Sequence, residues 1–316
     1  MTITFAGRPG RRRTHRRRPE PSRGPEPGPG ERPPLLRLLS LNVAHARREA
    51  SHQALLDPPA LRHNLATIAN VLRRESADVV ALQEADGPSA WSGDFDHVLT
   101  LAGLAGYDHT FRGEHNPFSF GGLELSSGTA LLSRLPLHEA RSHAFQQNWR
   151  DTKGFVAATV SPEANGGGEV DVVSIHLDFL LDRVRHRQVE QLVESFRDRE
   201  RPLIVMGDFN CEWSERRRSL ALLRRELRLR PVAGSAHATF PSWRPLVRLD
   251  WILISEELAF ASYRTLPDRL SDHLGVVAVI ELRAGNEASE PAGEELAPRR
   301  RRLRPRRAVR IATSLS

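Results

Sequence analysis

Between residues 35 and 282 the chain alternates short apolar segments with amphipathic helical stretches, and this alternation restricts the fold more than any other feature. Helical spacing of apolar residues occurs over residues 59–77, 181–199 and 214–227, with Ser214 as a candidate N-cap. No repeat or Gly/Pro linker interrupts this part, so we predict one α/β domain over residues 35–283. Apolar runs typical of strands cover residues 35–43, 78–84, 128–137, 153–160, 170–177, 202–210, 248–255 and 273–282.

The basic charge of the chain belongs to its two ends. The formal net charge is +7 and the sequence pI about 10.8. Residues 1–34 carry nine Arg and three Glu, and residues 284–316 carry eight Arg and four Glu, so the ends hold +10 and residues 35–283 carry −3. We predict that both ends are disordered, because Arg/Pro/Gly-rich segments cannot bury enough apolar surface to order themselves. Such tails either bind nucleic acid or an anionic membrane, or simply keep the protein soluble.

Several classes of protein are excluded or disfavoured by composition. The sequence has no run of about 18 apolar residues that would span a membrane. Its one cysteine, Cys211, excludes an intramolecular disulfide framework and is expected to be a buried thiol. The N-terminal arginines are not followed by an apolar segment, as a secretory signal requires. We therefore expect a cytoplasmic protein, and we expect it to be a monomer.

Polar residues stand at or near the ends of several of the predicted strands. A carboxylate at the end of a buried strand is costly unless it has a partner or a metal ion. Several such residues in one chain therefore predict a common pocket at the strand ends. The set contains carboxylates, imidazoles and carboxamides: Glu84, Asp208, Asp250, Asp272, His176, His273, Asn42 and Asn210.

These residue types suit a hard divalent cation and a phosphate group. Oxygen ligands with few imidazoles and no thiolate favour Mg²⁺, with Mn²⁺ as the alternative. Glu84 is the leading predicted ligand, assisted by Asn42 or Asp272. Asp208 would accept a proton from an attacking water, the imidazoles would donate to phosphate oxygens, and Asp250 would orient one imidazole in its charged form.

The ordered motifs resemble those of a known superfamily. LNVAH, ALQEAD, GTALLSRLPL, SIHLD, MGDFN, RLDWILIS and LSDH follow one another in the order found in the endonuclease/exonuclease/phosphatase (DNase I-like) superfamily, over residues 35–282. The chain is most similar to its small bacterial members of unsettled substrate. The resemblance implies a four-layer α/β sandwich, in which helices flank two facing mixed β-sheets. It also implies Mg²⁺-dependent phosphoester hydrolysis.

The resemblance also implies roles for single residues. Glu84 matches a metal-binding glutamate, and Asn42 matches an asparagine that supports metal or phosphate. Asp272 matches a metal ligand or its supporting carboxylate. The residues matching catalytic or phosphate-contacting positions are His176, Asp208, Asn210, Asp250 and His273.

Two departures from the abasic-site endonuclease pattern narrow the predicted substrate. That branch has an aspartate two residues after the asparagine, where this chain has Ala44, and a tyrosine where it has His176. Both differences favour a small or lipid-like phosphodiester. Three residues have open alternatives: Lys153 is a phosphate contact or an ordinary residue at a strand start, and Arg185 and Gln188 bind substrate or form a solvated helix face.

The leaving group is left open by the sequence, because loops 86–126 and 211–247 are expected to form the mouth of the site. His45, His109 and His115 are candidates to line it. We predict a phosphodiesterase. The alternatives are a DNA or RNA nuclease of the same superfamily and a non-catalytic nucleic-acid-binding protein that uses its basic tails. Aromatic residues in the two loops predict an apolar-edged mouth: Trp91, Phe118, Phe120, Trp213 and Trp243.

Overall fold

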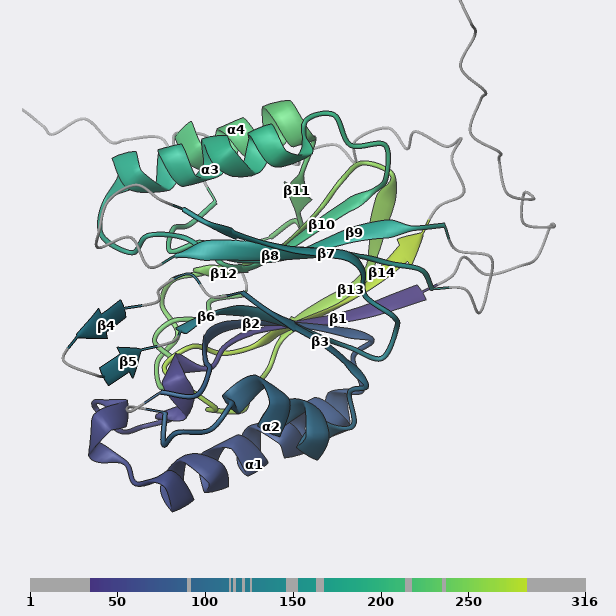
Figure 1. The fold of residues 1–316 in the computed structure, drawn as a ribbon. Helices are drawn as coiled ribbons and strands as arrows, with labels where there is room; N and C mark the ends of the chain where they lie inside the picture. The colour runs from purple at the N-terminus through teal and green to yellow at the C-terminus, as the bar shows by residue number, and fades with distance from the viewer. Residues whose placement is uncertain are drawn as a thin grey trace, which may run out of the picture. The chain divides into compact units, whose positions relative to one another are not determined.

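The computed structural model shows two six-stranded mixed sheets packed face to face between two pairs of helices, as Figure 1 shows. This is the predicted four-layer α/β sandwich. The two tails, Trp91 and Ser214 lie outside the described residues. The structure describes residues 35–89, 92–113, 115, 118–120, 123–125, 127–145, 153–162, 168–213, 218–234 and 237–282.

The first sheet is covered by helices α1 (Pro58–Glu75) and α2 (His97–Ala105). Asp57 and Asp96 cap these helices, each accepting a hydrogen bond from the backbone N–H three residues later. The strand order is β13 (Leu258–Thr265), β14 (Val276–Leu282), β1 (Leu35–Asn42), β2 (Val79–Asp86), β6 (Ser127–Ser133) and β3 (His109–Arg112).

The second sheet is covered by helices α3 (Asp182–Phe196) and α4 (Arg218–Leu227). A small hairpin, β4 (Phe118–Phe120) and β5 (Leu123–Leu125), is separate from both sheets. Two short 3₁₀ turns, η1 (Ala44–Ala46) and η2 (Gln53–Leu55), lie between β1 and α1 in the chain. The strand order is β11 (Arg230–Pro231), β12 (Asp250–Ile254), β10 (Leu203–Asp208), β9 (Val170–His176), β8 (Gly154–Val160) and β7 (His138–Ala144).

The two sheets have the same pairing pattern, in which only the central pair is parallel. In the first sheet this pair is β1 and β2, joined by α1, and in the second it is β9 and β10, joined by α3. The flanking pairs are antiparallel in both sheets. β1 contacts β10 and β2 contacts β9 across the interface, so the four carboxyl ends of the central strands meet at one edge.

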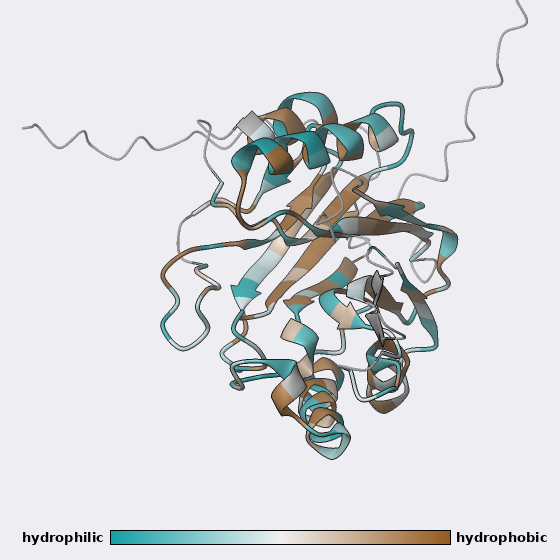
Figure 2. Ribbon diagram, turned by 60° about the vertical axis from the view of Figure 1, so that its left-hand side comes forward, coloured by the Kyte–Doolittle hydropathy of each residue, from teal (hydrophilic) through white to brown (hydrophobic). Residues whose placement is uncertain are grey.

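The core has three layers, and the side chains of the central strands alternate between them. In β1, Leu36 and Leu38 pack between the sheets, whereas Leu39 and Leu41 pack under α1. This alternation follows from the period of two in a strand. Figure 2 shows apolar strands in the interior and polar outer surfaces on the helices. Tyr107 belongs to the layer between the first sheet and its helices, where its hydroxyl donates to the carbonyl of Ala77.

The predicted elements are present, with shifted ends. The expected apolar face of 59–77 is buried in α1 at Leu61, Leu65 and Leu72. The sequence pattern does not predict α2, the strands β3, β7, β11 and β13, or the β4–β5 hairpin. These elements are short or lie at sheet edges, where a clear apolar period is lost. Within the described part of the chain, no helix is long and apolar enough to cross a membrane.

Candidate active site

Side chains of the central strands reach one pocket because they share the same alternation. In β9 and β10, the residues that face the other sheet include Val172 and Ile204, and counting on in steps of two leads to His176 and Asp208. The same count in β1 leads from Leu38 to Asn42. Each strand thus ends with a polar side chain directed into the space between the sheets.

Glu84 reaches the pocket by a β-bulge. The register of β2 against β6 shifts between Gln83 and Ala85, and Glu84 has a left-handed backbone with φ of 51°. Without the bulge, alternation would direct Glu84 toward the helices, because Gln83 already points inward and donates to Ser174 at 3.2 Å. A bulge commonly redirects a side chain near an active site. Here it places the carboxylate against Lys153 and His176, each 3.9 Å from Oε1.

Glu84 is ionised although it lies in a largely buried position. Burial alone would raise its pKa, but the positive charges of Lys153 and His45, with smaller effects of His176 and His273, lower the pKa to about 2. The side chain keeps 24% of its surface exposed. An ionised carboxylate that is still open to solvent is a suitable ligand for a cation.

Asp208 is the buried carboxylate of the pocket. Its Oδ2 accepts from the Asn42 amide at 3.1 Å, and its Oδ1 accepts from the backbone N–H of Asn210 at 2.9 Å. Burial raises its pKa to about 6, against the opposing charge of His273. The residue before it must be glycine, because a Cβ on Gly207 would lie 1.9 Å from the carbonyl oxygen of Ile175.

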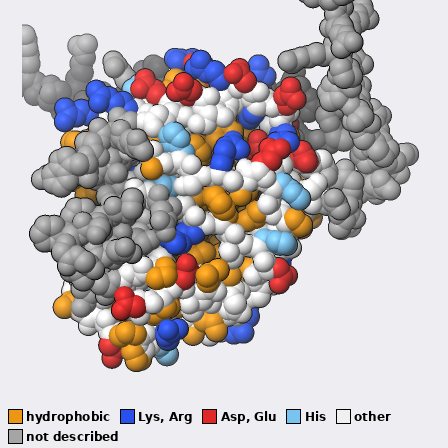
Figure 3. Space-filling view, viewed as in Figure 1, with side chains coloured by type: hydrophobic (Ala, Val, Ile, Leu, Met, Phe, Trp, Pro, Cys, Tyr) orange, Lys and Arg blue, Asp and Glu red, His pale blue; other side chains and the backbone are white. Residues whose placement is uncertain are grey.

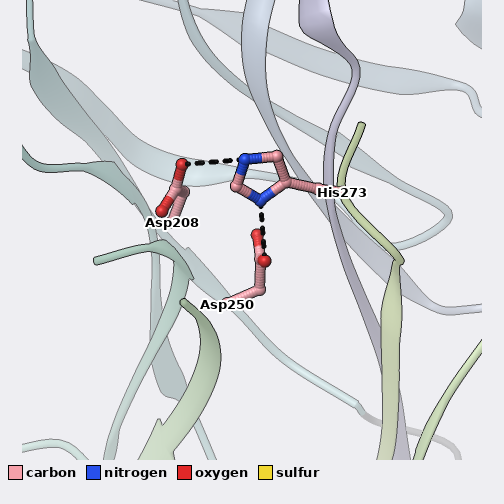
Figure 4. Close-up of side chains that lie close together, drawn as sticks. All are labelled: Asp208, Asp250 and His273. Carbon is pink, nitrogen blue, oxygen red and sulfur yellow. Dashed lines mark hydrogen bonds and ion pairs between the residues drawn. The ribbon is translucent and has the colours of Figure 1, made fainter. Parts of the chain in front are cut away.

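His273 lies between Asp208 and Asp250, as Figure 4 shows. Its Nδ1 is 2.8 Å from Asp250 Oδ2 and its Nε2 is 3.8 Å from Asp208 Oδ2. Burial opposes the charged ring, but the carboxylates of Asp250 and Asp208 raise the pKa of His273 to about 10. The ring of Phe240 packs against it at 4.9 Å between centroids. The predicted role of Asp250, to orient a charged imidazole, agrees with this geometry.

His176 is uncharged in the same pocket. Burial, together with the positive charge of Lys153, lowers its pKa well below the usual value. Lys153 Nζ lies 2.8 Å from Nε2 and 3.1 Å from Nδ1 of the ring, and Asp208 Oδ2 lies 3.5 Å from Nε2. Lys153 stands directly before β8, and its ammonium group points into the pocket, so a contact with phosphate stays a prediction.

Asn210, Asp272 and Arg47 complete the edge of the pocket. Asn210 has a left-handed backbone, with φ of 50°, and donates its amide to the carbonyl of Leu177 at 2.9 Å. The carboxylate of Asp272 does not lie free for a cation: its Oδ2 is 2.5 Å from Nη2 of Arg47. Arg47 therefore competes for the group that the sequence proposed as a metal ligand.

His45 joins the pocket through an unusual turn. Ala44, His45 and Ala46 in η1 all have left-handed backbones, with φ of 44°, 56° and 58°. His45 Nδ1 is 2.8 Å from Asp86 Oδ1, and Nε2 is 3.4 Å from Glu84 Oε2. Burial opposes charge on this ring, but the hydrogen bond and charge of Asp86 and the charge of Glu84 raise its pKa.

No role is predicted for Asp86 from sequence, and His45 is predicted only as a candidate to line the mouth of the site. The pattern QEAD contained a usable indication, since Asp86 is a second carboxylate two residues after Glu84 at the end of a buried strand. The other mouth histidines are placed differently. His115 is buried against Thr129 at 2.8 Å, and His109 pairs with Ser133 at the opposite end of β6.

Arg185 and Gln188 are buried, so the alternative of a solvated helix face is wrong. Gln188 Oε1 accepts from the backbone N–H of Asp178 at 2.8 Å, and Arg185 Nη1 donates to the carbonyl of Asp178 at 2.8 Å. Both side chains therefore hold the loop that follows His176. Direct contact between either of them and substrate stays a prediction.

The predicted apolar mouth is present in part. Trp243 is 60% exposed, whereas Trp213 packs against Trp251 at 6.0 Å between ring centroids. The side chains of Phe118 and Phe120 lie outside the described residues, as Trp91 does. Cys211 is buried, as expected.

The pocket holds a cluster of three donors and, apart from it, the carboxylate of Glu84. Asp208, Asp250 and His273 have ligand atoms within 4.8 Å of one another, but Asp250 and Asp208 face the two ring nitrogens of a histidine whose pKa is raised to about 10. These three side chains are buried and already joined by a hydrogen bond and an ion pair, so this group is better described as a hydrogen-bonded network. Glu84, ionised and partly open to solvent, fits a divalent cation.

Comparison with known proteins gives one family and one fold. A model described as the Endonuclease/Exonuclease/phosphatase family matches residues 39–273. No curated protein matches the chain by sequence. Among solved structures, an endonuclease/exonuclease/phosphatase from Beutenbergia cavernae is 22% identical, with a TM-score of 0.61, covering 79% of this chain and 72% of that one.

Two further structures show the same fold at low identity. The human Nocturnin catalytic domain with bound sulfate is 21% identical, with a TM-score of 0.59, covering 78% of this chain and 93% of that one. A mannosyl-6-phosphatase from Bacteroides thetaiotaomicron is 17% identical, with a TM-score of 0.58, covering 78% of this chain and 99% of that one.

Proposed function

Because the chain belongs to the Endonuclease/Exonuclease/phosphatase family, whose members are metal-dependent phosphoester hydrolases, we propose that it is a divalent-metal-dependent phosphodiesterase. The observation that carries this proposal is the position of Asp208. A buried carboxylate with a pKa raised to about 6 stands beside an imidazolium that a second carboxylate orients. A general base is most effective when its pKa lies near the working pH.

Asp208 is the proposed base. A water oxygen attacks phosphorus while Asp208 takes one of its protons, and the bond from phosphorus to the leaving-group oxygen breaks on the opposite side. The hydrogen bonds from Asn42 and from the backbone of Asn210 hold the two carboxylate oxygens in fixed directions. This fixed orientation limits the reorganisation needed during the reaction.

His273, Lys153, His176 and Asn210 are the proposed phosphate contacts. His273 is held as a cation by Asp250, and Lys153 adds a second positive charge 3.9 Å from Glu84 Oε1. Fixed donors in a partly buried pocket stabilise the charge that develops on phosphoryl oxygens. His176 stays neutral, so it can donate a hydrogen bond from one nitrogen without competing with these cations.

Glu84 is the proposed ligand of the cation, for which Mg²⁺ is the first candidate and Mn²⁺ the second. A bound cation would polarise a phosphoryl oxygen and neutralise developing charge. The fit rests on the ionised, partly exposed carboxylate of Glu84. Asn42 and Asp272 are less available, because their side chains already engage Asp208 and Arg47.

The loops at the pocket favour a substrate with an apolar group. Loop 177–181 follows β9, and loop 240–249 precedes β12. Both flank the end of β10, as shown by backbone hydrogen bonds from Leu177 to Asp208 and from Phe209 to Leu249. Their exposed apolar side chains contrast with α3 and α4, where Figure 3 shows basic and acidic side chains interspersed. The exposed side chains of the loops are Phe179, Leu180, Leu181, Trp243 and Leu246.

The first experiment measures hydrolysis of a bis-aryl phosphodiester by the full chain after chelation and after adding back Mg²⁺ or Mn²⁺. Activity should disappear with the chelator and return with either ion, and turnover without metal would exclude the proposed mechanism. The same preparation is then offered phospholipid, inositol phosphates, plasmid DNA and an abasic oligonucleotide. A preference for either DNA substrate would favour the nuclease alternative.

The apolar loops are tested with paired substrates that differ only in alkyl chain length. The double variant Phe179→Ser/Leu180→Ser should raise KM for the long-chain phosphodiester several-fold and leave KM for the methyl analogue unchanged. Leu104→Gln is the matched control, because Leu104 is an exposed leucine in the last turn of α2. Equal effects on both substrates would remove the loops from substrate recognition.

A further inference from the structure

We propose that His45 is a ligand of the divalent cation together with Glu84, and that Asp86 orients the imidazole for this purpose. The inference rests on the proposed metal dependence and adds a residue to it. It also predicts a metal preference, because one nitrogen ligand joins the oxygen ligands.

The distance between the two donor atoms fits a shared ion. His45 Nε2 lies 3.4 Å from Glu84 Oε2. Two neighbouring ligands of one octahedral ion, each about 2.1 Å from it, lie roughly 3 Å apart. Lys153 and His176 approach the other oxygen, Oε1, at 3.9 Å. The side of Glu84 that faces His45 is therefore distinct from the side that faces the proposed phosphate contacts.

The second nitrogen of His45 has the partner that a metal-bound histidine usually has. Nδ1 lies 2.8 Å from Asp86 Oδ1, and the side chain of Asp86 is fully buried. A ligating histidine commonly donates its other N–H to a carboxylate, which fixes the tautomer and the ring orientation. On binding, the Nε2 proton would leave to solvent while the Nδ1 proton stays on the hydrogen bond to Asp86.

The turn that carries His45 is strained and firmly held. Three successive non-glycine residues are left-handed, and this conformation costs roughly 1–2 kcal/mol per residue. The turn is pinned where the Ala46 carbonyl accepts from Asn64 at 2.8 Å and where the Ala44 N–H donates to Asn42 at 3.0 Å. Strain that is held in this way commonly marks a functional site, and here it directs the imidazole at Glu84.

The other predicted ligands are already engaged. Asp272 is paired with Arg47 at 2.5 Å. Asn42 donates to Asp208 at 3.1 Å and accepts from Ala44 at 3.0 Å. His45 directs Nε2 at Glu84, and both side chains stay partly exposed, at 19% for His45 and 24% for Glu84.

A nitrogen ligand changes the expected metal preference. Imidazole suits later transition metals such as Ni²⁺ and Zn²⁺, whereas Mg²⁺ and Mn²⁺ both prefer oxygen ligands. We therefore expect the full chain to bind Ni²⁺ more tightly than Mn²⁺ and Mg²⁺, and His45→Asn to reduce this preference. Asparagine is chosen because it tolerates the left-handed backbone at this position.

The test uses Mn²⁺ alone as the probe, without substrate. Electron paramagnetic resonance gives the dissociation constant, and electron spin-echo modulation detects a nitrogen nucleus bound to the ion. Wild type should show nitrogen modulation that Glu84→Gln and His45→Asn lose, with Mn²⁺ binding weakened. Asp86→Asn should weaken binding about 10–100-fold, the usual effect of losing the partner of a ligand. His138→Asn is the matched control, an exposed histidine on β7.

The outcomes separate the two proposals. Mn²⁺ binding that depends on Glu84 but shows no nitrogen modulation in wild type would overturn the role of His45 and leave the proposed function standing. Nitrogen modulation that survives in His45→Asn would overturn it too. Absence of any Mn²⁺ binding by wild type would contradict both. Circular dichroism of each variant confirms that it is folded before its binding is compared.

Discussion

The two sheets contribute to the pocket in different ways although their strand patterns are the same. In the second sheet, Asp208 and His176 sit in regular strands and reach the pocket by simple alternation. In the first sheet, Glu84 and His45 reach it only through left-handed backbone, one at a bulge and one in a strained turn. Glu84 and His45 are partly exposed, whereas Asp208 and His176 are buried.

This difference shows how one topology can serve two chemical tasks. A base needs a raised pKa, which burial in a regular strand supplies to Asp208. A metal ligand must stay ionised and reachable, so Glu84 is turned toward solvent and surrounded by positive charges. Variants of the buried and of the strained residues test this difference.

The largest effect is expected at the buried base. Asp208→Asn removes the proton acceptor but keeps the size of the side chain, so kcat for an aryl phosphodiester should fall roughly 10²–10⁴-fold. Mn²⁺ affinity should stay within about twofold of wild type, because the cation belongs to the other sheet. Steady-state kinetics and Mn²⁺ titration are made on the same sample. Near-wild-type kcat would remove Asp208 from the mechanism.

The second effect concerns the stability of the buried network. Asp250→Asn removes the nearer of the two buried carboxylates beside His273, so the free energy of unfolding at neutral pH should fall by roughly 3 kcal/mol. Asp171→Asn is the matched control on β9. This carboxylate is also buried, but it accepts a hydrogen bond from Thr159 and lies 3.7 Å from the partly exposed Arg201. Urea denaturation should show a clearly smaller loss for the control. Equal losses of unfolding free energy would mean that the pair of Asp250 and His273 contributes no more to stability than the interactions of Asp171.

The third effect is pH-dependent and concerns His115, a buried histidine whose pKa is shifted in the opposite direction from that of His273. Burial lowers the pKa of His115 to about 4, against a value of 6.5 for an ordinary histidine. The unfolded chain therefore binds the proton more readily, so stability is unaffected above about pH 6.5 and falls as the pH falls toward 4. At pH 5 the loss from this residue should be about 2 kcal/mol.

This contribution is measured as the change in unfolding free energy between pH 7 and pH 5. His115→Gln cannot titrate and can keep a hydrogen bond to Thr129, so its loss over this range should be about 2 kcal/mol smaller than that of wild type. An identical loss in both proteins would show that His115 is not held neutral.

The smallest expected effect compares a left-handed residue beside the pocket with a left-handed residue at the end of a helix. Ser76 ends α1 with a φ of 52°, and Ala46 has a φ of 58° in the turn that carries His45. Ser76→Gly should raise the free energy of unfolding by up to about 1 kcal/mol. Ala46→Gly should be nearly neutral, because relief of strain is offset by the loss of a buried methyl group, about 0.8 kcal/mol.

Urea midpoints give both stabilities, and Mn²⁺ titration gives the consequence for the site. Ala46→Gly should weaken Mn²⁺ binding several-fold, because a looser turn holds His45 less firmly. Ser76→Gly should leave the affinity unchanged. A similar affinity in all three proteins would mean that the strained turn is not needed to place His45.

Much of the fold and of the pocket was predictable from sequence for a specific reason. Period-two alternation is a local property, so the inward directions of Asn42, His176 and Asp208 follow from the strand pattern once the strands are recognised. The order of the motifs then identified the family. The edge strands β7 and β13 carry mixed burial and no clear apolar period, and they escaped prediction.

The sequence by itself therefore determined the layers, the family and the residues that end the central strands. Tertiary structure alone decided that Asp272 pairs with Arg47, that Arg185 and Gln188 hold a loop, and that His45 faces Glu84. The physical reason is that bulges and left-handed turns break the local period, and ion pairs join residues distant in the chain. Their outcome depends on which charges the folded protein brings together, which no local pattern records.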